Sequence, residues 1–152
     1  MTDEDLDGLD DGDRLCLVGH RWALDTAGAV RLTTVGGPAP IVDVPVAAPA
    51  GLVAAKCHAA GYPRATRRAT KHGGDLYDLF RLVEVFDARG ALRAELAMAP
   101  GGLGQLVAHV VQTEVLVNPP RGMRQMSEAA STALDIDRIV DVVEPFVAEL
   151  GS

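Results

Sequence analysis

The chain has 152 residues, of which 48% are hydrophobic and 23% are charged, which is enough for one domain around a single core. Its net charge of −7 is concentrated at one end. Seven of the 21 acidic residues fall in the first thirteen positions, and the remaining 14 balance the 14 Lys and Arg. A neutral body has no overall attraction for nucleic acid, so any phosphate binding must rest on a local basic patch.

The first fourteen residues, MTDEDLDGLDDGDR, carry too little apolar surface to offset the entropy of ordering them. They predict an acidic mobile tail, 1–14, ahead of a single domain at 15–152. Two cysteines, Cys16 and Cys57, form no CxxC motif, which is typical of a reducing compartment. No stretch approaches the ~20 apolar residues of a membrane span, and an acidic start is unlike a secretory signal. We therefore expect a cytoplasmic protein with no membrane partner.

The first half of the domain predicts one helix and a β-hairpin. Leu15, Val18 and Trp22 lie roughly on one helical stripe, and Gly28 is a plausible stop. The β-branched, alternating segments 29–35 and 41–46 flank a Gly-Gly-Pro turn, which predicts two paired strands. Pro49 then suits the first turn of a helix that carries Lys56.

The second half predicts helices only. A helix through 75–86 follows a basic turn, and further helical patterns cover 88–99, 103–117, 126–134 and 136–150. Pro119, Pro120 and Gly122 are expected to break the chain between two of them, and Pro145 is expected to kink the last. The predicted fold class is α+β: a small β-hairpin followed by a bundle of about five helices.

An unusual group of charges lies within these predicted helices. Lys56 falls on an otherwise apolar helical face, and Asp75 and Asp78 share one stripe of the next helix. A carboxylate about 4 Å from a partly buried ammonium offers on the order of 4 kcal/mol of attraction at an effective dielectric near 20, before desolvation is subtracted. We expect Lys56 to pair with Asp78. A structural alternative stays open, in which Asp75 is a helix N-cap and Lys56 extends toward solvent.

A basic segment connects the two helices. Its members follow i, i+3, i+4, i+7 spacing and would form one ridge on a helix: Arg64, Arg67, Arg68 and Lys71. Closely stacked like charges repel unless an anion joins them, and guanidinium groups match phosphate oxygens. The alternative is a solvated basic turn.

Zinc is a weaker candidate. Cys16, His20, Cys57 and His58 carry atoms that bind zinc, but their spacing matches no standard zinc site, and no metal site is predicted.

The order of these motifs resembles one known family. An apolar helix with Lys56-Cys-His-Ala, a basic turn ending in Lys71, and then Asp75-Leu-Tyr-Asp78-Leu is similar to the third and fourth motifs of the AbiEii/AbiGii-type nucleotidyltransferase toxins, to which the MenT toxins are similar. The resemblance implies that Lys56 contacts the triphosphate of an NTP, that Asp78 orients it or helps the acceptor attack, and that Asp75 supports them. It also implies magnesium, an acceptor such as tRNA, and a cognate antitoxin as partner.

The first motifs of that family have no counterpart here. They are a Gly-Ser and an Asp-x-Asp on a strand, which hold the triphosphate and magnesium. The sequence has Gly-Ser only at 151–152, and its Asp-x-Asp triplets lie in the tail or in the last part of the chain. Since nucleotidyl transfer depends on metal charge over the phosphates, the chain is expected to resemble a truncated or split enzyme, the C-terminal half of a nucleotidyltransferase-like domain. A complementing N-terminal half is then a further partner. The alternatives are a non-catalytic module that binds nucleotide, RNA or protein, and a remnant without its own function.

Overall fold

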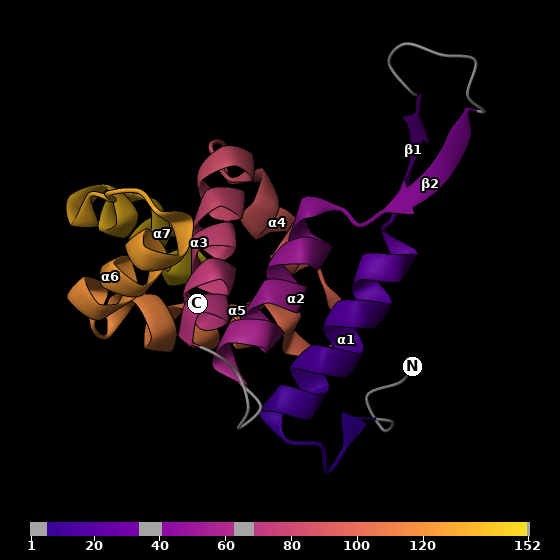
Figure 1. Cartoon of the computed structure of the whole chain (residues 1–152). Coiled ribbons are helices and arrows are strands. Elements are labelled where there is room, and N and C mark those ends of the chain that lie inside the picture. Colours follow the sequence, from indigo (N-terminus) through magenta and orange to yellow (C-terminus); the bar gives the residue numbers. More distant parts are fainter. Residues whose placement is uncertain (1–5, 34–40, 63–68, 152) are drawn as a thin grey trace.

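The computed structural model describes residues 6–33, 41–62 and 69–151, and within them the fold is α+β and mostly helical. In the described residues, a two-stranded antiparallel sheet lies between α1 and α2, and six α-helices follow it, where about five were expected (Figure 1). The elements are α1 (Asp11–Asp25), β1 (Gly28–Leu32), β2 (Val42–Val46), α2 (Pro49–Gly61), α3 (Ala69–Phe86), α4 (Ala91–Ala97), the 3₁₀-helix η2 (Pro100–Gly102), α5 (Leu103–Val111), the π-helix η3 (Gln112–Leu116), α6 (Pro119–Ala130) and α7 (Ile136–Leu150).

The acidic segment joins the domain earlier than the sequence predicted. The Asp10 side chain accepts a hydrogen bond of 2.8 Å from the backbone N–H of Asp13 and so caps α1, which begins at Asp11. Leu6, only 4% exposed, packs into the core. The boundary predicted at residue 14 is therefore wrong for the described part of this segment, because one buried leucine and one N-cap are enough to attach it to the helical body.

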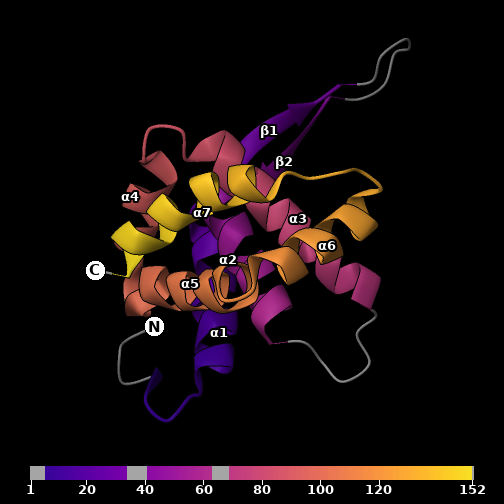
Figure 2. The ribbon, with the colours of Figure 1, turned by 90° about the vertical axis from the view of Figure 1, so that its left-hand side faces the viewer.

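The predicted hairpin is present and stands away from the helices. β1 and β2 pair in register from Gly28 opposite Val46 to Leu32 opposite Val42. Figures 1 and 2 show both strands projecting beyond the ends of α1 and α2. Every described strand residue is exposed except Val44, which is partly buried. The hairpin therefore contributes little to the core.

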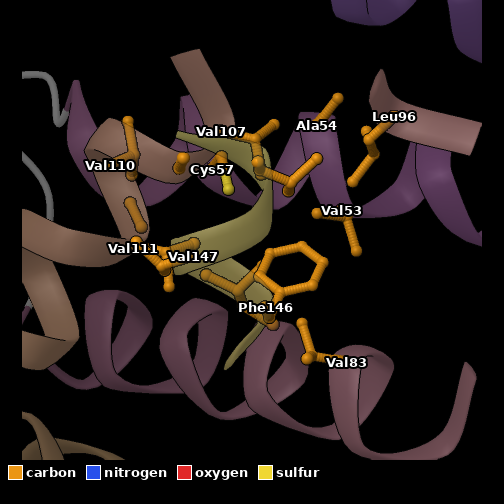
Figure 3. Packing of buried hydrophobic residues seen from close by; sticks show 14 of the residues in the cluster. Val53, Ala54, Cys57, Val83, Leu96, Val107, Val110, Val111, Phe146 and Val147 are labelled. Carbon is orange, nitrogen blue, oxygen red and sulfur yellow. The ribbon is translucent and has the colours of Figure 1, made fainter. Parts of the chain in front are cut away.

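Helix α2 lies at the centre of the helical body. Its residues Val53, Ala54, Cys57 and Ala60 are fully buried. Figure 3 shows Phe146 of α7 pointing between α2 and α3, with the side chains of Val53 and Val83 on its two sides. Helices α1, α3 and α5 pack directly against α2, and Phe146 reaches it from α7. This packing determines which part of α2 remains at the surface.

Helices α5 and α6 differ from their predicted bounds for local reasons, whereas α7 has the predicted bounds. α6 begins at Pro119, where a break was expected, because prolines suit a first helical turn and the Asn118 side chain caps the backbone N–H of Arg121 at 3.2 Å. The predicted helix at 126–134 is therefore the second half of α6, which ends at Ala130. The helix predicted over 103–117 is α5 continued by the π-turn η3. Helix α7 continues through Pro145. Among the described residues, no helix combines the length and apolarity that a membrane crossing requires.

A close approach of α3 and α6 generates the first prediction. A Cβ at Gly73 would overlap the backbone carbonyl oxygen of Gln125 in α6, whereas a Cβ at the neighbouring Gly74 meets nothing within 4 Å. Gly73→Ala should lower the free energy of unfolding by about 1–3 kcal/mol, because two packed helices must separate. Gly74→Ala should leave it unchanged or raise it by up to about 1 kcal/mol, since alanine favours a helix interior.

Urea unfolding of both variants checks this contrast. Equal destabilisation by the two substitutions would contradict the described α3–α6 contact.

Candidate functional site

Packing of α2 and α3 determines where the charged group lies. Val53, Cys57 and Ala60 hold one side of α2 in the core, and Leu76, Leu79, Phe80 and Val83 do the same for α3. Lys56 and the stripe of Asp75 and Asp78 then fall beside these buried faces, at the line where the two helices meet. The helical periods read from the sequence therefore predict which charges meet.

The Lys56 ammonium lies between the two carboxylates. Its Nζ donates to Asp75 Oδ1 at 3.0 Å and to Asp78 Oδ2 at 2.6 Å. The expected Lys56–Asp78 pair is thus present, and Asp75 joins it. The side chains differ in exposure: Asp75 is 8% exposed, Lys56 32% and Asp78 51%. The Asp75 carboxylate therefore holds the lysine from the buried side, and the Asp78 carboxylate faces water.

Asp75 does not cap a helix. Helix α3 begins at Ala69, so Asp75 lies in its second turn, and it is buried. The N-cap alternative is therefore wrong, because the helix starts within the predicted basic turn, before the Gly73-Gly74 pair. A buried carboxylate inside a helix needs a charged or hydrogen-bonding partner, and Lys56 provides one.

The two carboxylates keep Lys56 charged. Partial burial alone would lower its pKa, but the hydrogen bonds to Asp78 and Asp75 outweigh desolvation and raise the pKa above its ordinary value. Lys56 is therefore a fixed positive charge at neutral pH. It suits the binding of an anion and does not suit a role as a general base.

The predicted basic ridge is only partly described. Arg64, Arg67 and Arg68 lie outside the described residues. Lys71 is exposed on α3 and precedes Asp75 and Asp78 by four and seven residues, so the three positions share one stripe of the helix. Lys71 therefore adds a second ammonium one turn from the Lys56 group.

The described residues do not form a metal centre. They contain no group of three or more His, Cys, Asp or Glu side chains arranged to hold a metal ion. Cys57 is fully buried, and burial raises the pKa of its thiol. Cys16 and His20 share one face of α1, and the His20 ring meets the edge of His58 with centroids 6.0 Å apart. The four side chains considered for zinc are thus not assembled around one point.

One polar pair in the structure was not predicted from the sequence. His72 Nε2 of α3 lies 3.3 Å from Glu114 Oε2 of η3, and both side chains are largely buried. The two residues are far apart in the chain, and no local pattern connects them. A π-turn is often found at functional sites, but it leaves no sequence signal that could have indicated the pair.

Two grooves lie away from the Lys56 group. One, of about 470 Å³, is lined by α6 and the turn after it, including Met123, Arg124 and Leu134. The other, of about 320 Å³, lies between η3, the start of α6 and α7. Neither groove is lined by Lys56, Asp75 or Asp78.

Comparison of the chain with family models, with curated proteins and with solved structures gave no match. The resemblance to the AbiEii/AbiGii-type toxins stays a prediction that rests on the motifs.

The unequal burial of the two carboxylates generates a second prediction. Asp75→Asn should lower the free energy of unfolding by about 1–3 kcal/mol, because it removes a buried charged partner of Lys56. Asp78→Asn should lower it by at most about 1 kcal/mol, since exposed ion pairs contribute little. Chemical denaturation measures both. A larger loss for Asp78→Asn would contradict the anchoring role of Asp75.

The raised pKa of Lys56 generates a third prediction. A group whose pKa is raised in the folded state stabilises the fold below its ordinary pKa of 10.5, and this contribution disappears as pH rises through the native pKa. The wild type should therefore exceed Lys56→Met in stability at about pH 8, and this difference should shrink at about pH 11.

Unfolding midpoints at both pH values show whether the stability difference shrinks as pH rises. Lys71→Met is the matched control for loss of an exposed lysine on the same surface. A stability difference between the wild type and Lys56→Met that grows with pH would contradict the prediction.

Proposed function

We propose that the chain provides the Lys56–Asp78 half of a nucleotidyltransferase-type site of the AbiEii-like kind, which transfers a nucleotide from an NTP to an acceptor such as tRNA when the other half is present. The observation that carries the proposal is the ammonium of Lys56, held between two carboxylates 19 and 22 residues later in the chain and still about one third exposed. These are the residues on which the family resemblance rests.

The geometry supports phosphate binding by Lys56. An ammonium has three N–H donors, and Asp75 and Asp78 accept from two of them, which leaves one for a ligand. The buried Asp75 fixes the direction of the lysine. Asp78, half exposed, holds the ammonium from the solvent side, so the two carboxylates together direct the third N–H toward a ligand.

Local charge sets a condition on the ligand. The carboxylates of Asp75 and Asp78 outnumber the single ammonium of Lys56, and Lys71 on the same stripe restores the balance. These four charges of the described residues cancel, so they do not by themselves offset the charge of a triphosphate, and magnesium that arrives with the nucleotide would do so.

The described residues do not fit a resident magnesium site, since they hold no group of three ligands for a metal. The metal-binding carboxylates that the resemblance implies would belong to a complementing segment, and no catalytic step is assigned to the chain alone. Lys56 and Asp78 position the nucleotide, and positioning is a large part of phosphoryl and nucleotidyl transfer.

Titration calorimetry of the purified chain with an NTP and magnesium tests the proposal. Lys56→Ala should weaken binding at least about tenfold, because its ammonium is the group that meets the phosphates. Arg21→Ala is the matched control. It removes an exposed cation that pairs with Asp25 on α1 and should leave the affinity unchanged. No binding by the wild-type chain would contradict the proposal.

Asp78→Ala separates an oriented site from simple charge attraction. Removing a negative charge raises the affinity for a triphosphate if only net charge matters. If Asp78 orients Lys56, the same substitution lowers the affinity, which is the result we expect. Thermal unfolding of each variant shows whether a loss of binding reflects a loss of fold. A chain that binds NTP but transfers no nucleotide with a complementing half would be a non-catalytic binding module.

A further inference from the structure

The line along which α2 and α3 meet continues past the charged group in one direction. Lys56 of α2 meets Asp78 of α3. Three residues earlier on α2, Val53 lies beside Phe146, which has Val83 on its other side (Figure 3). Val83 is five residues later on α3 than Asp78, so the two helices run antiparallel. The start of α2 therefore lies beside the end of α3.

The side chains at this end of the line are aliphatic and accessible. Leu52 precedes Lys56 by one helical turn. Leu82 follows Asp78 by one turn, and Val85 lies three residues further on. Leu52 is 39% exposed and Val85 52%, while Leu82 is partly buried against the core. We call Leu52, Leu82 and Val85 the apolar shelf.

The charged group and the apolar shelf together fit one kind of ligand. Seven residues of helix separate Asp78 from Val85, which is about 10 Å. A molecule that lies along this line needs an anionic group at one end and an apolar part at the other. An extended nucleotide has this form and a comparable length, with its phosphates at one end and its flat base at the other.

We propose that the apolar shelf is the subsite for the base of the nucleotide, and that it accepts every base. The inference rests on the proposed function, since Lys56 must hold the phosphates for the base to reach the shelf. One face of the base packs on the three side chains, and the apolar area that this removes from water adds affinity. The three side chains carry no hydrogen-bonding group. The donors and acceptors on the edge of the base are therefore not read by the shelf, and strong discrimination between bases requires such groups.

The charged residues nearest in the sequence do not alter the apolar shelf. Arg81 pairs with Glu84, and Glu84 also pairs with Arg138 of α7. These ion pairs lie on the side of α3 that faces α7, whereas Leu82 continues the line of Asp78 beside α2. The shelf formed by the described residues thus stays aliphatic next to the ammonium of Lys56.

Two ligands distinguish the base from the phosphates. Titration calorimetry of the full chain compares ATP with inorganic tripolyphosphate, which has no base, both with magnesium. ATP should bind at least about tenfold more tightly, although tripolyphosphate carries the greater negative charge. Equal affinities would overturn the base subsite alone and leave phosphate binding at Lys56 standing. Failure of both ligands to bind would overturn the subsite together with the proposed function.

Truncation of the apolar shelf should affect one ligand only. Leu52→Ala should weaken ATP binding about three- to tenfold and leave tripolyphosphate binding unchanged, whereas Lys56→Ala should weaken both. Val85→Ala repeats the test at a more exposed position, where an effect on folding is smaller. Leu24→Ala is the matched control, because it truncates a leucine that is 74% exposed on α1. An equal loss of ATP affinity in Leu24→Ala, or ATP affinity unchanged in both shelf variants, would overturn the inference.

The four common NTPs test the absence of base selection. Their affinities should lie within about tenfold of one another, with purines above pyrimidines because a purine covers more apolar area. A preference of more than about a hundredfold for one base would overturn the inference, because the three aliphatic side chains cannot produce it.

Discussion

The structure depends on the close packing of α2 among its neighbours. Small residues make this possible: a Cβ at Gly51 would lie 2.7 Å from Ala23 Cα of α1, and one at Gly61 would lie 2.8 Å from Val110 of α5. Ala54, Cys57 and Ala60 are buried between these two contacts. A helix enclosed in this way has one strip of surface left for a polar residue, and Lys56 occupies it. The position of the candidate site thus follows from the core.

Helix α3 completes the site under the same constraint. Its buried stripe faces the core, and its next stripe, with Asp75 and Asp78, faces α2 beside Lys56. A half-buried ammonium without carboxylates would be costly, and a buried Asp75 without an ammonium would be more so. Each charge makes the other tolerable, which is a structural role. That role does not require Asp78 and part of Lys56 to be exposed to solvent. Their exposure leaves both side chains accessible, and this accessibility favours the binding of a ligand.

The sequence predicted those features that have a local period or a local signal. Apolar residues at helical spacing predicted the helices, alternating β-branched segments predicted the hairpin, and Pro49 predicted the start of α2. The Lys56–Asp78 pair was predicted because both residues lie on helical stripes beside a core stripe. Other predictions failed. Leu6, in the segment predicted to be a mobile tail, packs into the core, and Asp75 is buried in a helix that starts seven residues earlier than an N-cap at Asp75 would require. His72 and Glu114 could not be predicted because their pairing depends on how α3 and η3 pack.

The hairpin and the charged site are subject to different physical constraints. Lys56 and the two carboxylates belong to the helical body, and their geometry follows from a core that is already complete. The hairpin adds almost nothing to that core, yet its alternation is strict and its one ion pair lies on a single side. A strand pair kept only as a connection between α1 and α2 needs no such separation of aliphatic and charged sides.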